Sequence, residues 1–353
     1  MSRDANASAQ LDEAALGAYL EKHVEGFKGL TEAKKFSGGQ SNPTYLLTAN
    51  SGRYVMRAKP PGELLKSAHQ VDREYRVMKA LGPTDVPVPK MFHLAPDGDE
   101  SPIGRMFYVM EYLDGRVLWD PRLTELDPEQ RFQTYDALNA ALAALHDVDV
   151  ASVGLESFGR PGSYYERQFG RWSKNYRASE TEHHPDMEAL IKWLEENMPA
   201  DDGTVCLVHG DYRLDNAMFH PTEPKLLAVL DWELSTLGHP FADLGYQCAY
   251  WRLPYSERVR GIGNLERSRA TGLPVEQEYV EAYCKRRGLT GIPNWEFYVA
   301  FSLFRYAAII QGVYKRGLDG NASDPETAMK SGKNVPIVAR VAVEGLEKAG
   351  ISL

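Results

Sequence analysis

Apolar positions in the first third of the chain switch between helical and alternating spacing. Residues 11–29 repeat them at helical intervals, which predicts a helix. Residues 36–49 and 53–59 predict two strands; the first carries a glycine-containing turn and the second alternates strictly. A helix is predicted over residues 68–81, where Gly-Pro ends the pattern, and an apolar strand over residues 106–113.

The remainder of the chain is mostly helical in pattern. Helices are predicted over residues 128–147, 163–177 and 186–198. Short strands are predicted over residues 205–209, 217–219 and 226–232. Helical spacing returns after residue 240, whereas residues 1–10 and 319–334 carry no clear pattern and are expected to be loose.

These elements predict an α+β fold built from two lobes. Residues 1–110 would form a small lobe with an antiparallel sheet, and residues 117–353 a larger, helix-rich lobe. Residues 111–116, where a strand runs into Asp-Gly, would be the hinge between them. A chain of 353 residues is long enough for such a two-part core.

Composition narrows the class of protein. The chain is 43% hydrophobic and 25% charged, which is ordinary for a globular protein. Its net charge of −9 argues against nucleic acid as a partner. The three cysteines are far apart and form no CxxC pair, which favours a reducing compartment. The first ten residues lack the apolar stretch of a signal peptide, so we expect a cytoplasmic protein.

The most apolar segment covers residues 298–310. It is short and interrupted by Ser302 and Arg305, so a core helix is expected there rather than a membrane span, and no membrane partner is expected. If Arg305 is buried, its charge requires a partner, which could be a carboxylate of the protein or of a substrate.

The most informative motif is His-Gly-Asp-x₄-Asn, which ends an apolar run and is followed by a strand pattern that ends in Asp-Trp-Glu. It supplies Asp211, Asn216 and Asp231. Phosphoryl transfer from ATP needs these groups: a carboxylate that takes the proton of the attacking hydroxyl, and an amide oxygen and a second carboxylate that hold Mg²⁺. Asp211 is the predicted catalytic base, and Asn216 and Asp231 are the predicted metal ligands.

Two further side chains of this motif are candidate catalytic residues. Arg213 could neutralise charge that builds on the moving phosphate, or it could be a surface arginine. His209 stands at the end of the strand pattern, and a single histidine there more often orients the loop than reacts.

A glycine-containing turn between the first two predicted strands is a candidate phosphate loop. Backbone amides of Gly38, Gly39, Ser41 and Asn42 could point at phosphate oxygens, although Gly-Gly in a hairpin is more often only a turn.

On the next strand, Arg57 and Lys59 share one face, and either could grip the phosphates, with Glu74 of the following helix as the carboxylate that holds it. The carbonyl of Glu111 and the amide of Leu113 are the predicted contacts to adenine.

These motifs resemble those of the aminoglycoside phosphotransferase/choline kinase family, which has the protein-kinase-like fold, over roughly residues 30–320. The family's catalytic motif is matched by His209, Gly210, Asp211 and Asn216, and its metal-binding aspartate by Asp231. The resemblance implies that Asp243 supports the catalytic loop. Arg57 stands where many members of the family have lysine; arginine keeps the charge and can bind two phosphate oxygens.

Within this group, the segments around residues 37–45, 60–62, 68–74 and 165–172 look most like the kinase domain attached to some acyl-CoA dehydrogenases. That subgroup implies an ATP- and Mg²⁺-dependent transfer to the hydroxyl of a small acyl compound. An aminoglycoside- or choline-type kinase and a non-catalytic nucleotide-binding protein are the alternatives. Asp-Trp-Glu in place of Asp-Phe-Gly, and the short segment 234–242, argue against a protein kinase.

The predicted helix over residues 163–177 bears on the acceptor. Its aromatic face comprises Tyr165, Phe169, Trp172 and Tyr176, and its basic face comprises Arg167, Arg171 and Lys174. The aromatic face is typical of core packing, and the basic face is typical of solvent exposure, although it could bind an anionic acceptor. A cationic aminoglycoside would instead favour the acidic residues Glu180, Glu182, Asp186 and Glu188. Charge alone leaves the acceptor open.

Overall fold

The computed structural model describes residues 11–36, 42–61, 70–256, 259–322 and 324–353. The chain divides into two compact units. The first unit comprises Met1–Asp114 and Asp231–Glu233, and the second comprises Gly115–Leu230 and Leu234–Leu353. The boundary after Asp114 lies inside the predicted hinge, whereas the segment Asp231–Glu233 belongs to the first unit rather than to the helical part of the chain.

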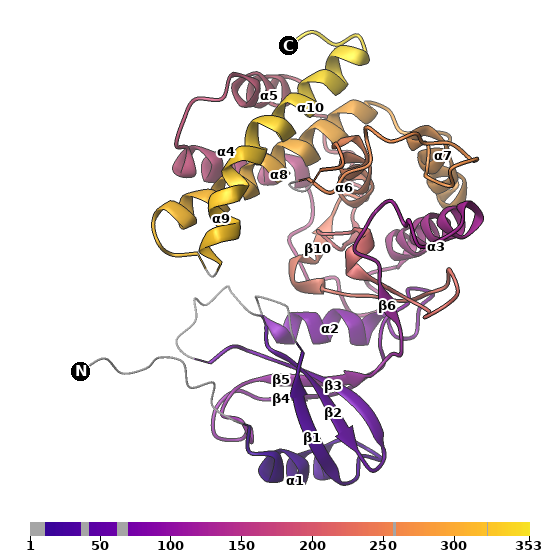
Figure 1. The fold of residues 1–353 in the computed structure, drawn as a ribbon, viewed down its shortest axis with the longest axis vertical. Coiled ribbons are helices and arrows are strands. Elements are labelled where there is room, and N and C mark those ends of the chain that lie inside the picture. Colours follow the sequence, from indigo (N-terminus) through magenta and orange to yellow (C-terminus); the bar gives the residue numbers. More distant parts are fainter. Residues whose placement is uncertain (1–10, 37–41, 62–69, 257–258, 323) are drawn as a thin grey trace. The chain divides into compact units, whose positions relative to one another are not determined.

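The first unit contains a five-stranded antiparallel sheet with the strand order β1-β2-β3-β5-β4. Its strands are β1 (Leu30–Lys35), β2 (Thr44–Ala49), β3 (Gly52–Ala58), β4 (Met91–Ala95) and β5 (Phe107–Glu111). The helices α1 (Glu13–His23) and α2 (Val71–Leu81) lie on opposite faces of this sheet (Figure 1).

The alternating pattern of β3 orients its side chains as predicted. Tyr54, Met56 and Ala58 are buried in the core that the sheet shares with α1. Because successive residues of a strand point to opposite faces, Arg57 projects to the other face of the sheet. The register places Tyr108 of β5 directly opposite Arg57.

The helices and strands predicted from the sequence differ in two ways from those of the first unit. The helix predicted over residues 11–29 ends at His23, and Gly26 and Gly29 follow it with φ angles of 79° and 61°, which an α-helix does not allow. The strands β1 and β4 carry no apolar alternation, since most of β1 is exposed and β4 is half-buried along its length. The predicted start of α2 at residue 68 lies outside the described residues.

The second unit is mainly helical. Its helices are α3 (Pro128–Asp147), α4 (Tyr164–Ser179), α5 (Pro185–Glu196), α6 (Phe241–Arg252), α7 (Glu276–Arg287), α8 (Trp295–Leu318), α9 (Pro325–Ser331) and α10 (Val335–Lys348). Helices α3, α4 and α5 match the predicted ranges closely. The expectation that residues 319–334 are loose is wrong for residues 325–334, because α9 and the 3₁₀ turn η3 (Gly332–Asn334) lie there.

Two small sheets complete the second unit. One pairs β7 (Cys206–Val208) with β10 (Thr236–Gly238). The other joins β6 (Arg116–Val117), β8 (Ala217–Phe219) and β9 (Leu226–Val229). The segment between β7 and β8 therefore connects the two sheets, and it carries the His-Gly-Asp motif and the 3₁₀ turn η1 (Leu214–Asn216).

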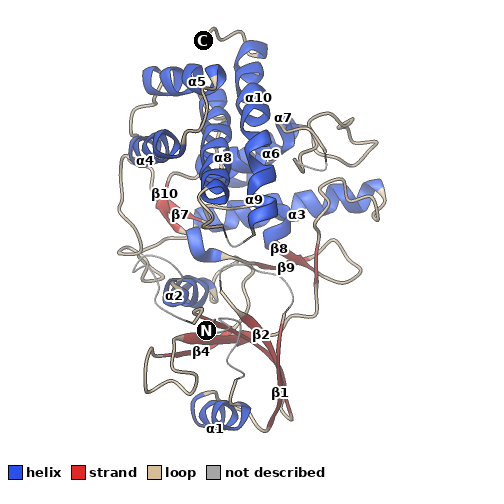
Figure 2. Cartoon of the chain, turned by 60° about the vertical axis from the view of Figure 1, so that its left-hand side comes forward, coloured by secondary structure: helices blue, strands red, loops and turns tan. Residues whose placement is uncertain are grey.

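The long helix α8 occupies the middle of the second unit, with α4, α5, α6, α9 and α10 packed around it (Figure 2). Among the described residues it is the one helix that is long and apolar enough to cross a membrane, judged by length and composition alone. However, 72% of its most apolar window is buried inside the protein. Its apolar side chains, including Phe301 and Phe304, pack as expected of a core helix.

Helices α6 and α8 approach each other closely at Gly245. A Cβ atom at this position would lie 2.8 Å from the carbonyl oxygen of Tyr298 and 3.3 Å from Oγ of Ser302. Only glycine therefore permits this distance between the two backbones.

We expect Gly245→Ala to lower the free energy of unfolding by about 1–3 kcal/mol, because the added methyl group must push α8 away from α6. Gly170→Ala in α4 is the matched control, since a Cβ atom there would meet nothing within 4 Å. That variant should gain about 0.5–1 kcal/mol from the better helix propensity of alanine. Urea unfolding measures both values, and a neutral Gly245→Ala would contradict the close approach.

Candidate active site

Arg57 lies at the centre of a buried ion-pair network in the first unit. Its Nε atom lies 3.0 Å from Oε2 of Glu74, and its Nη2 atom lies 3.1 Å from Oδ1 of Asp231. Glu74 is only 1% exposed. It also accepts hydrogen bonds from the hydroxyl of Tyr108 at 3.0 Å and from Nδ2 of Asn42 at 2.9 Å. The strand cation that pairs with Glu74 is therefore Arg57.

Arg57 and its carboxylate partners shift one another's pKa values. Burial raises the pKa of Glu74 to about 7; Arg57 opposes this effect, whereas Asp231 and Glu233 reinforce it. Burial would lower the pKa of Arg57, but the surrounding carboxylates hold it above its ordinary value, so the guanidinium stays charged. Arg57 is thus a charged residue held between the carboxyl groups of Glu74 and Asp231.

Lys59, the alternative cation, is engaged elsewhere. Its Nζ atom lies 2.6 Å from Oδ2 of Asp97, and the other oxygen of Asp97 accepts a hydrogen bond from the amide of Met106. Lys59 lies just after the end of β3. It pairs with Asp97, in the segment between β4 and β5, rather than with Glu74. The geometry favours Arg57 over Lys59 as the residue that would grip phosphates.

The structure describes only some of the other residues that were predicted to bind the nucleotide. Gly38, Gly39 and Ser41 lie outside the described residues. Asn42 is buried, and its amide group supports the carboxylate of Glu74. Glu111 is the last residue of β5, where its amide donates to the carbonyl of Lys90 at 2.9 Å. Leu113 follows two residues later, beyond the end of the strand.

His209 begins the catalytic loop and is fully buried. Its Nε2 atom lies 2.8 Å from the carbonyl oxygen of Leu230 and must carry the proton, because a carbonyl only accepts. Its Nδ1 atom accepts the amide hydrogen of Asp211 at 3.2 Å. With both ring nitrogens engaged and no exposed surface, His209 orients the loop and does not reach a substrate, which corrects its place among the predicted catalytic residues.

Asn216 binds Asp211 twice. Its Nδ2 atom donates to the carbonyl oxygen of Asp211 and to Oδ2 of the same residue, both at 2.9 Å. Because the nitrogen of the carboxamide faces Asp211, its oxygen faces away and is oriented as a potential ligand for a cation. The carbonyl of Asn216 in turn accepts the amide of Leu230 at 2.8 Å. Asp231 is the next residue and has the left-handed φ angle of 63°.

Arg213 is half-buried between two carboxylates of its own loop. Its Nε atom lies 3.1 Å from Asp215 and 3.5 Å from Asp211, and Nη1 donates to the hydroxyl of Tyr250 at 3.2 Å. Burial would lower the pKa of Arg213, but Tyr250 and the two carboxylates hold it above its ordinary value. Arg213 is therefore a charged residue beside the predicted base and not a free surface arginine.

Asp243 of α6 anchors the same loop and is 1% exposed. Its Oδ2 atom accepts the amide of His209 at 2.6 Å, and its Oδ1 atom accepts the amide of Gly210 at 2.8 Å. His146 of α3 lies 3.3 Å from the same carboxylate. Burial would raise the pKa of Asp243, but His146 and the other hydrogen-bond donors hold it below its ordinary value.

Sequence reasoning missed two residues that support the candidate site, Tyr108 and His146, and it singled out Arg305 without finding its partner. Tyr108 binds Glu74, His146 binds Asp243, and Arg305 of α8 donates from Nη2 to the carbonyl of Gly210 at 2.6 Å. Each comes from an element remote in sequence, and only the fold brings it to its partner. Arg305 could be recognised in the sequence as a charge inside an apolar helix. Its partner, however, is a backbone carbonyl and not the expected carboxylate.

The aromatic face of α4 packs largely in the core, and its basic face lies largely at the surface. Tyr165 and Tyr176 are buried, and Tyr165 packs against Phe301 of α8 with ring centroids 5.2 Å apart. Arg167 donates to the carbonyl of Arg160 at 2.7 Å, so it holds the preceding loop and is less available for an acceptor than its charge suggests.

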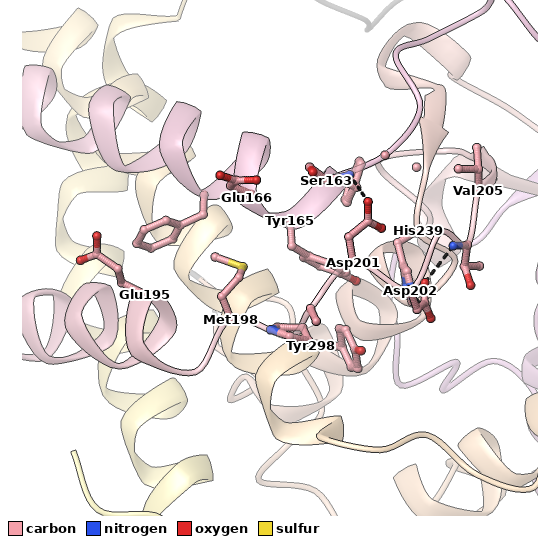
Figure 3. A pocket seen from close by; sticks show the side chains of 17 residues that line it. Ser163, Tyr165, Glu166, Glu195, Met198, Asp201, Asp202, Val205, His239 and Tyr298 are labelled. Carbon is pink, nitrogen blue, oxygen red and sulfur yellow. Dashed lines mark hydrogen bonds and ion pairs between the residues drawn. The ribbon is translucent and has the colours of Figure 1, made fainter.

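A cavity of about 440 Å³ lies at the amino end of β7, between α4, the loop before β7 and the segment after β10 (Figure 3). Its acidic and histidine lining residues are Glu166, Glu195, Asp201, Asp202 and His239. None of the predicted site residues within the described chain lines it, since Asp211 follows the opposite end of β7. Its acidic lining suits a cationic ligand.

Comparison with known proteins identifies the class. A family model described as the phosphotransferase enzyme family matches residues 32–279, and the chain belongs to this family. A solved structure of a Ralstonia eutropha protein assigned as an aminoglycoside phosphotransferase is 48% identical, with a TM-score of 0.87, and covers 96% of this chain and 99% of its own. The predicted α+β, kinase-like fold class is thereby confirmed.

Longer proteins are also similar. Acyl-CoA dehydrogenase family member 10 of Mus musculus is 47% identical over 337 residues, which cover 94% of this chain and 31% of that protein. Family member 11 of Homo sapiens is 42% identical over 323 residues, which cover 90% of this chain and 41% of that protein. The chain thus spans a third to two fifths of their length. A spectinomycin phosphotransferase solved with ADP shares the fold at 13% identity and a TM-score of 0.63, covering 94% of this chain and 98% of its own.

Folding stability should depend on pH through His146. Burial lowers the pKa of His146 below its ordinary value of 6.5, although Asp243 opposes this effect. As the pH falls below that value, the unfolded chain takes up a proton that the folded protein resists, so stability decreases on acidification. Asp243, whose pKa is also lowered, adds a further loss only below its ordinary value of 3.8.

Unfolding free energies measured between about pH 8 and pH 5 test this dependence. In His146→Gln the decline should be shallower than in the wild-type protein, while the other histidines titrate equally in both. Parallel curves for the two proteins would show that His146 makes no contribution.

Proposed function

We propose that this member of the phosphotransferase family transfers the γ-phosphate of ATP to a hydroxyl group of a small molecule, with Mg²⁺ as the metal. The observation that carries this proposal is the double hydrogen bond from Asn216 to Asp211. It holds a carboxylate ready for a proton and turns an amide oxygen toward a cation within one short loop. Both are requirements of phosphoryl transfer from ATP.

Asp211 is the proposed base. The acceptor hydroxyl attacks the γ-phosphorus, the bond from that phosphorus to the bridging oxygen breaks, ADP leaves, and the hydroxyl proton passes to Asp211. Arg213 lies 3.5 Å from Asp211, where its charge can stabilise negative charge on the moving phosphoryl group. His209 and Asp243 hold the backbone of the loop and do not take part in the transfer.

The metal ligands are proposed to be the amide oxygen of Asn216 and the carboxylate of Asp231. Mg²⁺ prefers oxygen donors and takes few protein ligands when phosphates supply the others, and this donor set fits that preference. Bound Mg²⁺ would neutralise charge on the phosphates. Arg57, which pairs with Asp231, is the proposed phosphate-binding residue.

The proposed acceptor is a hydroxyacyl compound. Support comes from relatives of 42–47% identity that are named as acyl-CoA dehydrogenase family members. An aminoglycoside-like cationic acceptor is the second candidate, because the cavity beside α4 is lined by four carboxylates. The acidic residues near α5 favour it less, since Arg177 pairs with both Glu180 and Glu188.

An ATP-consumption screen of the purified protein against hydroxyacyl-CoAs, free hydroxy acids, choline, homoserine and aminoglycosides tests the function. We expect turnover with a hydroxyacyl compound. Turnover with an aminoglycoside alone would select the second candidate, and Mg·ATP binding without turnover on any acceptor would favour a non-catalytic nucleotide-binding protein.

Asp211→Asn should reduce kcat by about 10²–10⁴-fold, because the amide cannot take the hydroxyl proton. Affinity for Mg·ATP, measured by calorimetry, should change little. Asp215→Asn is a matched control, since Asp215 also pairs with Arg213 but is not the proposed base. Equal losses in the two variants would point to disruption of Arg213 and would remove the base assignment.

Arg57→Gln should weaken Mg·ATP binding by about 10-fold or more, because a charged hydrogen bond to phosphate is worth about 1.5–3 kcal/mol. Lys59→Gln removes the same charge two residues later and should leave the dissociation constant close to that of the wild-type protein. A loss confined to Lys59→Gln would reassign the phosphate contact to Lys59.

A further inference from the structure

Arg305 is a buried arginine with an unusual partner. The residue is 8% exposed, and its Nη2 atom donates to the carbonyl of Gly210 at 2.6 Å. The rings of Trp172 and Tyr246 flank the guanidinium, with centroids 5.7 Å and 5.3 Å from Cζ. Of the residues that the structure describes, none offers Arg305 a carboxylate within 4.0 Å.

Two other arginines with little exposed side-chain surface are paired with acidic residues. Arg252 binds Glu276 and Glu296, and Arg57 binds Glu74 and Asp231. Burying a guanidinium without a carboxylate is costly. The Nε atom of Arg305 is enclosed, and the described part of the chain offers it no acceptor. Packing alone does not explain a charged side chain in this place, since an apolar residue would fill the same space at lower cost. The contact to Gly210 is the feature that requires a donor.

Gly210 is held from both sides of its own backbone. Its amide donates to Asp243 of α6, and its carbonyl accepts from Arg305 of α8. Its φ angle is 85°, and a Cβ atom would lie 2.6 Å from the carbonyl oxygen of Leu234, so no other residue fits there. The carbonyl that Arg305 holds belongs to the peptide bond between Gly210 and Asp211.

We propose that Arg305 is a positioning residue for the base Asp211. It fixes the plane of the peptide that precedes Asp211, and Asn216 fixes the carbonyl and carboxylate that follow. The inference rests on the proposed phosphotransfer function. A charged donor suits the task, because a hydrogen bond from a cation to a carbonyl is stronger than a neutral one.

The packing of α8 explains how a residue so remote in sequence reaches the loop. Gly245 lets α6 and α8 approach closely, and α6 carries Asp243 two residues earlier. The same helix crossing thus brings Asp243 to the amide of Gly210 and Arg305 to its carbonyl. Arg305 therefore connects the predicted catalytic loop to the helix around which the other helices of the unit pack.

Steady-state kinetics and hydrogen exchange of Arg305→Lys and Arg305→Gln test the proposal. We expect kcat to fall by about 10–100-fold in Arg305→Gln and by less in Arg305→Lys, because a misplaced base loses orientation while a lysine keeps a charged donor. KM for Mg·ATP should stay within about twofold, since Arg305 holds the base and not the nucleotide. The amides of His209, Gly210 and Asp211 should exchange faster in both variants.

Arg316→Gln is the matched control, because Arg316 is an exposed arginine of the same helix. It should leave kcat and the exchange of the loop unchanged. Wild-type kcat together with wild-type exchange in Arg305→Lys and Arg305→Gln would overturn the proposal. If Arg305→Gln does not fold, Arg305→Lys alone decides, since wild-type values in both measurements would have the same meaning.

Failure of the two proposals can be told apart. If the wild-type protein transfers phosphate to no acceptor, the proposed function fails, and the exchange rates of the loop still report whether Arg305 anchors it. If the wild-type protein is active and the Arg305 variants match it in kcat and exchange, only the positioning role fails.

Discussion

The structure depends on how one glycine peptide is held in a buried, charged environment. Asp243 accepts the amides of His209 and Gly210, and Arg305 donates to the carbonyl of Gly210. Backbone groups in this place cannot reach water, so each must find a partner within the protein. Charged side chains supply these partners, and Asn216 holds the carboxylate of Asp211.

The first unit rests on a different balance of charges. Arg57 is surrounded by Glu74, Asp231 and Glu233, and burial raises the pKa of Glu74 to about 7. Arg57 is thus held by carboxylates on more than one side. A protein that binds a divalent cation together with phosphates can use such an arrangement, since the cation can pair with a carboxylate and the phosphates with the arginine. Binding strength and local stability are then linked through the same few side chains.

Relations between neighbouring residues were the most predictable part of the site. The pairing of Asn216 with Asp211, five residues earlier, and the alternation that sends Arg57 away from the core depend on short spacing and are seen in the structure. Tyr108 was not predictable as a partner of Glu74, because its position opposite Arg57 depends on the register between β3 and β5. The strand β1 was missed for a related reason: its charged, exposed residues are kept in the sheet by pairing and not by apolar burial.

The amino-acid sequence by itself determined the family, the α+β class and the identity of the acid, amide and cation candidates, because these depend on residue type and short spacing. The tertiary structure decided between Arg57 and Lys59 as the partner of Glu74, assigned His209 to support of the loop, and brought His146 and Arg305 to their partners. Those outcomes depend on contacts between helices and strands far apart in the chain. Such contacts are set by the packing of whole elements, which no local pattern encodes.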